Sequence, residues 1–244
     1  MLVYYHGSMK RNSTYAQHFL RSPRLVHELI GHSDIKRTDI VFDLGAGSGV
    51  ITSALAARAS RVVAVENEPN AVQKLQENMR IYDNVTVLKK DILAVEFPDH
   101  SFKVFANIPF HLSSEVVRTL TSLVHQPASI YLVVQRQFAR KLLPTHAGFS
   151  SQLGMLIGPW WTVRIRRPLL RRDFTPPPAV DTVLLEIKPH PHPLILPAKR
   201  SRYERFVKRA FTDLRFYEKY LKKSCKPSSL TLDEWVRAFK MFND

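Results

Sequence analysis

Short apolar runs alternate along this chain with segments of helical periodicity. The runs that read as buried strands lie at 39–44, 61–65, 85–88, 102–106, 128–134, 160–165 and 182–187. Helical character is found between several of them, at 50–56, 69–80 and 135–143. Continuous apolar runs are typical of strands buried on both faces, and their alternation with helices is typical of a mainly parallel sheet. The pattern therefore predicts an α/β fold.

A second, smaller region follows the last of these strands. Its start is marked by prolines, which interrupt regular structure: Pro189, Pro191, Pro193 and Pro197. Beyond them, 203–221 has the periodicity of an amphipathic helix, and a short last helix begins at Ser229 or Thr231. We therefore predict two domains, a large sheet domain over 1–188 and a small helical domain over 189–244.

The ends of the first three strands carry residues suited to binding a nucleoside. Gly45, Gly47 and Gly49 form a Gly-x-Gly-x-Gly turn between the first strand and its helix, where a ligand can approach the backbone closely. Glu66 ends the second strand, about 20 residues further on, where a carboxylate can accept hydrogen bonds from both ribose hydroxyls. Asp91 and Ile92 follow the third strand; the carboxylate can accept from an adenine amino group while Ile92 packs on the ring.

Each of these features alone also fits a structural role. A glycine turn can be purely structural, Glu66 can be a solvated strand end, and Asp91 can cap a helix. Their order is more informative, because the carboxyl ends of parallel strands line one crevice, which is where ligands bind. The spacing also differs from the dinucleotide Gly-x-Gly-x-x-Gly pattern. The set predicts S-adenosylmethionine as the cofactor.

The fourth strand ends in Asn107-Ile108-Pro109-Phe110. This cluster suits methylation of an exocyclic amino group, whose nitrogen is a poor nucleophile because its lone pair is delocalised. The Asn107 side-chain oxygen and the Ile108 carbonyl can accept both N–H bonds, and Phe110 can stack on the ring. Pro109 removes a backbone donor and keeps Ile108 extended. The tetrapeptide alone is also compatible with an ordinary surface turn.

The ordered set resembles the ribosomal RNA adenine N6-methyltransferase family, which includes the dimethyladenosine transferases and the macrolide-resistance Erm enzymes. Two further segments are similar to family motifs: Gln17-His18-Phe19-Leu20 and Phe174-Thr175-Pro176-Pro177-Pro178-Ala179-Val180. The resemblance implies a Rossmann-like S-adenosylmethionine-dependent methyltransferase sheet with a small C-terminal helical domain. It also implies cofactor contacts from His18, Leu20 and Asn107, and a place for Phe174 beside the target base. His18 stands where the family usually has Asn.

Two features resemble the Erm branch more than the small-subunit dimethyltransferases: the loop reads Asn-Ile-Pro-Phe, and the 91–107 stretch is compact. The resemblance thus implies methylation of 23S rRNA and macrolide resistance. A small-subunit rRNA dimethyltransferase of ribosome maturation remains an alternative, as does a non-catalytic RNA-binding protein that kept the fold. Ile108 and the Phe174 segment disfavour a DNA adenine or protein-amide methyltransferase, where Pro-Pro-Tyr or Pro-Pro-Phe is typical.

The charge of the chain points to a polyanionic partner. Its 244 residues carry a formal net charge of +15, and basic residues are clustered. One cluster precedes Phe174: Arg164, Arg166, Arg167, Arg171 and Arg172. Another opens the C-terminal region: Lys199, Arg200, Arg202, Arg205, Lys208 and Arg209. We expect the first cluster to hold the RNA backbone beside the target adenine, and the second to add non-specific phosphate contacts.

Other residues favour blander roles. Cys225 is the only cysteine, so a disulfide framework within the chain and a cysteine-based zinc site are excluded. The His190-Pro191-His192-Pro193 stretch reads as a linker rather than a metal site, and we expect no metal. Trp160 and Trp161 favour core packing over RNA contact, and His111 reads as a loop residue rather than a base. No apolar run approaches the ~18 residues of a membrane span, so we expect a cytoplasmic protein. We also expect a monomer.

Overall fold

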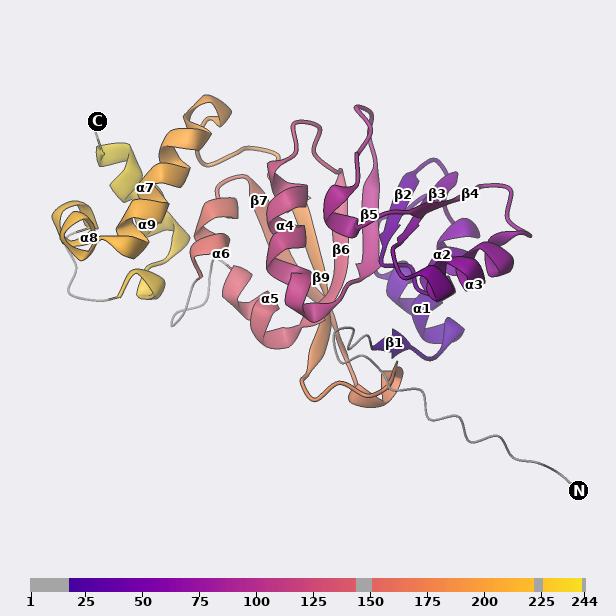
Figure 1. The fold of residues 1–244 in the computed structure, drawn as a ribbon. Coiled ribbons are helices and arrows are strands. Elements are labelled where there is room, and N and C mark those ends of the chain that lie inside the picture. The colour runs from indigo at the N-terminus through magenta and orange to yellow at the C-terminus, as the bar shows by residue number, and fades with distance from the viewer. Residues whose placement is uncertain (1–17, 144–150, 222–225, 243–244) are drawn as a thin grey trace, which may run out of the picture.

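The computed structural model describes residues 18–143, 151–221 and 226–242 (Figure 1). In this described part, one mixed sheet of seven strands forms the centre of the molecule. Its strands are β2 (Ile40–Leu44), β3 (Arg61–Glu66), β4 (Val85–Lys89), β5 (Lys103–Asn107), β6 (Ser129–Gln135), β7 (Trp161–Leu169) and β9 (Thr182–Pro189). The predicted α/β sheet is confirmed. Gln17 and Cys225 lie outside the described residues.

The spatial order of the strands is β4-β3-β2-β5-β6-β9-β7. Strands β2 to β6 are parallel to one another, whereas β9 runs antiparallel to both of its neighbours, β6 and β7. The chain moves outward from β2 to β3 and β4, and then returns to β5 on the other side of β2. Such a reversal opens a crevice at the carboxyl ends of the strands. The glycine turn after β2 and Asn107 at the end of β5 therefore lie at this crevice.

Helices cover both faces of the sheet because its central strands are apolar on both sides. In β6, Ile130, Leu132 and Val134 belong to one core cluster, and Tyr131 and Val133 belong to another. The helices against the first cluster are α4 (Ser113–Ser122), α5 (Arg136–Leu142) and α6 (Gln152–Ile157). Those on the opposite face are α1 (Pro23–Gly31), α2 (Val50–Ala56) and α3 (Pro69–Met79).

A separate two-stranded ribbon joins two segments that are far apart in the sequence. Strand β1 (Phe19–Leu20) pairs antiparallel with β8 (Phe174–Thr175), placing Leu20 opposite Phe174. The backbone N–H of Arg21 donates to the carbonyl of Asp173 at 2.9 Å and continues the connection. The ribbon brings His18, Phe19 and Leu20 next to the segment that begins at Phe174, and β1 lies below the main sheet in the view of Figure 1.

The C-terminal region contains two helices where one was predicted over 203–221. The break lies at Asp213, whose backbone is extended and whose carboxylate accepts from the Phe216 N–H at 3.0 Å, so this residue caps the second helix. The last helix starts after Thr231, as one of the two predicted starts had it, and Thr231 and Glu234 form its capping box. These helices are α7 (Arg200–Thr212), α8 (Leu214–Leu221) and α9 (Leu232–Met241).

The C-terminal helices gather beside α6 (Figure 1) and share its hydrophobic cluster. Trp160 is 4% exposed and Trp161 is fully buried, which confirms their predicted core packing. The Trp160 indole N–H donates to the carbonyl of Ile195 at 3.0 Å, and the Tyr203 hydroxyl donates to the carbonyl of Met155 at 3.0 Å. The helical region thus completes a core that begins on the sheet. Among the described residues, no helix is both long and apolar enough to cross a membrane.

Candidate active site

The glycine turn connects β2 to α2 through backbone conformations that other residues rarely adopt. Gly47 has a φ of 57° and Gly49 a φ of 94°, both in the left-handed region. A side chain at Gly49 would also come within 2.8 Å of Leu75 and Met79. The turn is anchored to the neighbouring strand, because the N–H of Gly45 donates to the Val65 carbonyl at 2.8 Å. The result is a tight turn whose backbone is open to the crevice.

Glu66 holds this turn in place. Its side chain is 3% exposed, and one carboxylate oxygen accepts the Gly47 N–H at 2.8 Å. The other oxygen accepts the N–H groups of Asn67 and Glu68 at 2.8 and 3.0 Å. Each carboxylate oxygen can accept more than one hydrogen bond, so Glu66 can hold the turn and still accept from a ligand hydroxyl. The alternative of a solvated strand end is wrong.

Asp91 and Ile92 follow β4 at the start of the short 3-10 helix η1 (Ile92–Ala94). The Asp91 carboxylate accepts the Leu93 N–H at 2.8 Å, which is the capping role that the sequence left open. The side chain is nevertheless exposed, so it keeps capacity to accept from a ligand. Ile92 is 8% exposed and packs into the core. Their predicted contacts with the adenine of the cofactor stay predictions.

The Asn107–Phe110 loop lies beside the glycine turn, since a side-chain carbon at Gly45 would be 3.9 Å from the Pro109 ring. Ile108 is 2% exposed, and its buried side chain anchors the loop. Pro109 precedes the 3-10 helix η2 (Phe110–Leu112), which leads directly into α4. The Asn107 amide N–H donates to the carbonyl of His18 at 2.7 Å.

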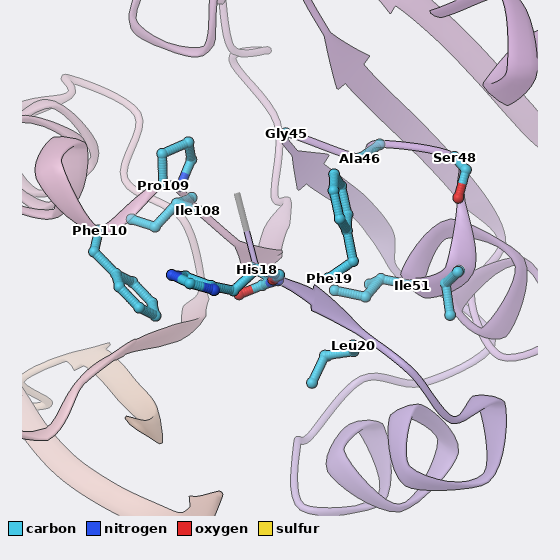
Figure 2. Close-up of a pocket in the computed structure, with 12 residues that line it drawn as sticks. His18, Phe19, Leu20, Gly45, Ala46, Ser48, Ile51, Ile108, Pro109 and Phe110 are labelled. Atoms are coloured by element: carbon cyan, nitrogen blue, oxygen red, sulfur yellow. The ribbon is translucent and has the colours of Figure 1, made fainter. Parts of the chain in front are cut away.

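A cleft opens between these parts (Figure 2). The glycine turn forms one side, the Asn107–Phe110 loop the other, and the residues of β1 lie between them. The lining residues are His18, Phe19, Leu20, Gly45, Ala46, Ser48, Val50, Ile51, Asn107, Ile108, Pro109 and Phe110. The structure therefore brings together most of the predicted cofactor and catalytic residues. Gly47, Glu66, Asp91 and Ile92 lie outside this lining.

Phe174 does not flank the cleft as the resemblance implied. It is fully buried and belongs to the same hydrophobic cluster as Leu20 and Leu184. The cause is the β1–β8 pairing, which places Phe174 opposite Leu20 and turns both side chains into the core. In this conformation the Phe174 ring is packed in the core and is not exposed to a base.

The arginines before Phe174 differ in their surroundings. Three of them lie near a carboxylate. The guanidinium of Arg166 is 3.8 Å from the Glu186 carboxylate, and that of Arg171 is 3.9 Å from the Asp181 carboxylate. Arg167 forms an ion pair with Glu28. Within the described part of the chain, Arg164 and Arg172 are exposed and have no ion pair. Arg164 lies opposite Glu186, well inside β7, and therefore away from the crevice edge of the sheet.

These surroundings predict unequal effects on RNA binding. Arg172→Ala should lower the slope of the logarithm of the RNA-binding constant against log salt concentration by about one unit, because the substitution removes one phosphate contact of an exposed arginine. Arg166→Ala is the matched variant, and it should change the slope less but lower the melting temperature slightly, because the buried carboxylate of Glu186 loses one of its two cations and keeps Lys188. Filter binding across salt concentrations and thermal melts check both. Equal slopes in all three proteins would show that Arg172 does not contact phosphate.

Asp43 is a buried acid next to the glycine turn, to which our sequence reading assigned no role. It lies on β2 two residues before the glycine turn, fully buried, and one oxygen accepts the Thr52 hydroxyl at 2.6 Å. The other oxygen has no hydrogen-bond partner among the described residues. Burial, with a smaller contribution from the nearby Glu66 charge, outweighs the Thr52 hydrogen bond and raises the pKa of this carboxyl from 3.8 to about 7. The signal was present in the sequence, as an acid inside an otherwise apolar strand.

The raised pKa predicts a specific pH dependence of stability. The native carboxyl binds its proton up to about pH 7, whereas its ordinary pKa is 3.8. The free energy of unfolding should therefore fall as the pH rises from about 4 to about 7, and then level off. Asp43→Asn cannot ionise and should lack this loss. Melting temperatures of both proteins between pH ~4 and ~8 test this, and a difference that is constant with pH would contradict it.

Comparison with known proteins identifies the family. The ribosomal RNA adenine dimethylase family model matches residues 8–224. The chain belongs to this family. It is 30% identical over 183 residues to an rRNA adenine N-6-methyltransferase of Enterococcus faecalis, covering 75% of this chain and 73% of that protein. It is 34% identical over 178 residues to a mitochondrial ribosomal RNA small subunit methyltransferase of Arabidopsis thaliana, covering 71% of this chain but 46% of that protein.

Solved structures show the same fold. The crystal structure of the 23S rRNA methyltransferase ErmE superimposes with a TM-score of 0.78 at 24% identity, over 91% of this chain and 98% of that one. A dimethyladenosine transferase from Plasmodium falciparum gives 0.72 at 23% identity, over 84% and 80%. The predicted Rossmann-like methyltransferase fold is confirmed. The family makes the protein an S-adenosylmethionine-dependent rRNA adenine methyltransferase.

Proposed function

We propose that this rRNA adenine methyltransferase is of the Erm type and transfers methyl groups from S-adenosylmethionine to N6 of an adenine in 23S rRNA. The observation that carries the proposal is that the glycine turn after β2 and the Asn107–Phe110 loop after β5 line the same cleft. One side of this cleft suits the cofactor, and the other suits an exocyclic amino group. Macrolide resistance is the role that this activity implies.

The residues on the cofactor side fit S-adenosylmethionine. The turn is held by Glu66, whose buried carboxylate can accept from the ribose hydroxyls. Asp43 lies buried just before Gly45 and connects β2 to α2 by accepting the Thr52 hydroxyl. Asp91 and Ile92 are at the next strand end, where the adenine ring is expected. The cofactor supplies the methyl group on a positively charged sulfur, from which an amino nitrogen displaces it.

The residues on the other side orient the target amino group. The Asn107 amide gives its N–H to the His18 carbonyl, which leaves its oxygen free to accept an N6 hydrogen. The Ile108 carbonyl accepts the second, and Phe110, which is half-buried, offers a ring for the extruded adenine. Orientation of this kind can supply effective molarities of roughly 10⁵–10⁸ M. No strong base is required, because the N6 proton becomes acidic only after the methyl bond forms.

The choice of 23S rRNA rests on the sequence of the loop and on the extent of similarity. Asn-Ile-Pro-Phe and the compact 91–107 stretch resemble the Erm branch. The chain also covers 73% of the Enterococcus faecalis enzyme, against 46% of the Arabidopsis thaliana small-subunit enzyme. The 34% identity to the latter nevertheless favours methylation of small-subunit rRNA as the second candidate.

The two candidates are separated by the choice of RNA. Purified protein and S-adenosylmethionine with a tritiated methyl group are incubated with naked 23S rRNA, naked 16S rRNA, and each assembled subunit. We expect label in naked 23S rRNA and little in the other samples. Label confined to 16S rRNA or to the small subunit would favour the second candidate, and RNA binding without label in any sample would favour a non-catalytic role.

A further inference from the structure

His18 lies where the β1–β8 ladder stops. Because Phe19 pairs with Thr175, the antiparallel register continues to His18 opposite Pro176. Pro176 has no N–H, so a backbone ladder cannot be completed there. The imidazole of His18 makes the connection to Pro176 instead of the backbone, because its Nδ1 lies 2.8 Å from the Pro176 carbonyl oxygen. A carbonyl only accepts, so Nδ1 carries the proton and donates it.

The same residue contacts the catalytic loop in two ways. The His18 ring stacks on Phe110, with centroids 5.5 Å apart and planes inclined by 27°. The His18 carbonyl accepts the Asn107 amide N–H at 2.7 Å. That second contact defines which end of the amide faces the substrate, because a flipped amide would set its oxygen against the His18 oxygen. His18 therefore connects Asn107 and Phe110 with the segment that follows Phe174.

The ring of His18 points away from the cofactor side of the cleft. Figure 2 shows it directed toward Phe110, whereas the ring of the next residue, Phe19, rises beside the glycine turn. A side-chain carbon at Gly47 would be 3.0 Å from the Phe19 ring. Neighbouring residues of an extended segment point to opposite sides, so this stretch serves the two halves of the cleft separately: Phe19 serves the cofactor half and His18 the target-base half.

We propose that His18 is a positioning residue of the target-base half of the site, and that its ring does not bind the cofactor. Its hydrogen bond to Pro176 sets the distance between the Phe110 loop and the Phe174 segment, and its stack on Phe110 sets the tilt of that ring. This inference rests on the proposed function of the cleft as an adenine N6-methylation site. It also explains how the chain works with histidine where the family usually has asparagine.

Three substitutions separate the two contacts. In His18→Asn, the amide N–H group has nearly the position of the imidazole Nδ1–H, so the bond to Pro176 can be kept and the stack is lost. In His18→Phe, the stack is kept and the bond is lost. His18→Ala loses both. All three leave the backbone carbonyl that holds Asn107, and His18 is only half-buried, so the chain should fold. His111→Ala is the matched control, because this exposed histidine directly follows Phe110 in η2.

The measurements are single-turnover methyl transfer to naked rRNA, S-adenosylmethionine affinity by calorimetry, and rRNA affinity by filter binding. We expect His18→Ala and His18→Phe to lower the transfer rate by about tenfold or more, since small misplacements of reacting groups cost up to ~10²-fold. His18→Asn should stay within about threefold of wild type. Cofactor affinity and rRNA affinity should stay within about twofold of wild type in all three, and His111→Ala should match wild type throughout.

Several results would overturn this inference. A wild-type rate in His18→Ala would remove the positioning role, and a loss of cofactor affinity that matches the loss of rate would return the ring to the cofactor. His18→Asn as slow as His18→Ala, or an equal loss in His111→Ala, would also contradict it. The rates are compared on whichever rRNA the wild-type enzyme methylates. Failure of the proposed 23S substrate would therefore show in the wild type, and failure of this inference only in the variants.

Discussion

Asn107→Ala is expected to reduce methyl transfer almost to background while rRNA affinity stays within about twofold of wild type. In the proposed mechanism the side-chain oxygen of Asn107 accepts an N6 hydrogen, and the amide N–H donated to the His18 carbonyl leaves that oxygen free to do so. Most of the RNA affinity should come from phosphate contacts elsewhere, so binding and chemistry separate. Single-turnover transfer and filter binding measure the two quantities.

The matched control for this variant is Asn70→Ala, which removes an exposed amide on α3. It should behave like the wild type in both measurements. Single-turnover rates of Asn107→Ala within about twofold of wild type would remove Asn107 from its assigned role. A parallel loss of rRNA affinity and rate would mean that Asn107 acts through substrate binding alone.

Glu66→Ala is expected to weaken S-adenosylmethionine binding by at least several-fold. The carboxylate accepts three backbone N–H groups, one of them from Gly47 in the glycine turn. Leaving buried polar groups without a partner costs ~1–3 kcal/mol. Asp91→Ala should also weaken binding by several-fold, although Asp91 is exposed and the cost should be the smaller of the two. Titration calorimetry measures both affinities.

Conservative variants sharpen the comparison. Glu66→Gln keeps the size of the side chain but replaces one acceptor oxygen with a donor, so it should resemble Glu66→Ala. Asp91→Asn keeps an acceptor for the Leu93 N–H, so the cap on η1 should survive and any loss of affinity should come from the ligand. Wild-type cofactor affinity in both alanine variants would remove Glu66 and Asp91 from the site.

The sheet and the glycine turn that lines the cleft could be predicted because their signals are local. Each strand is a run of apolar residues. Glu66 is the last residue of its strand, and Asp91 follows the next strand closely. Parallel pairing then places successive strand ends at one edge of the sheet without any further information. Asp43 could have been assigned in the same way, since an acid inside a buried strand needs a reason to be there.

The burial of Phe174 and the ion pairs of the arginines before it could not be predicted, because they depend on contacts between distant segments. The strands β1 and β8 are two residues each, too short for any periodicity to show, and their pairing buries Phe174. The ion pairs that engage Arg166 and Arg167 depend on neighbours from β9 and α1. The break at Asp213 was missed because the hydrophobic period continues through it, while the residue itself is a strong helix cap.

The measurement that tests the central claim most directly is the chemical identity of the product. After incubation of rRNA with S-adenosylmethionine and the enzyme, the RNA is digested to nucleosides and analysed by mass spectrometry. We expect N6-methylated adenosine with wild-type protein and none with Asn107→Ala. A methyl group on a ribose, on another base or on another adenine atom would contradict the assigned geometry of Asn107 and Ile108. So would an unmethylated product from a wild-type protein that binds both cofactor and rRNA.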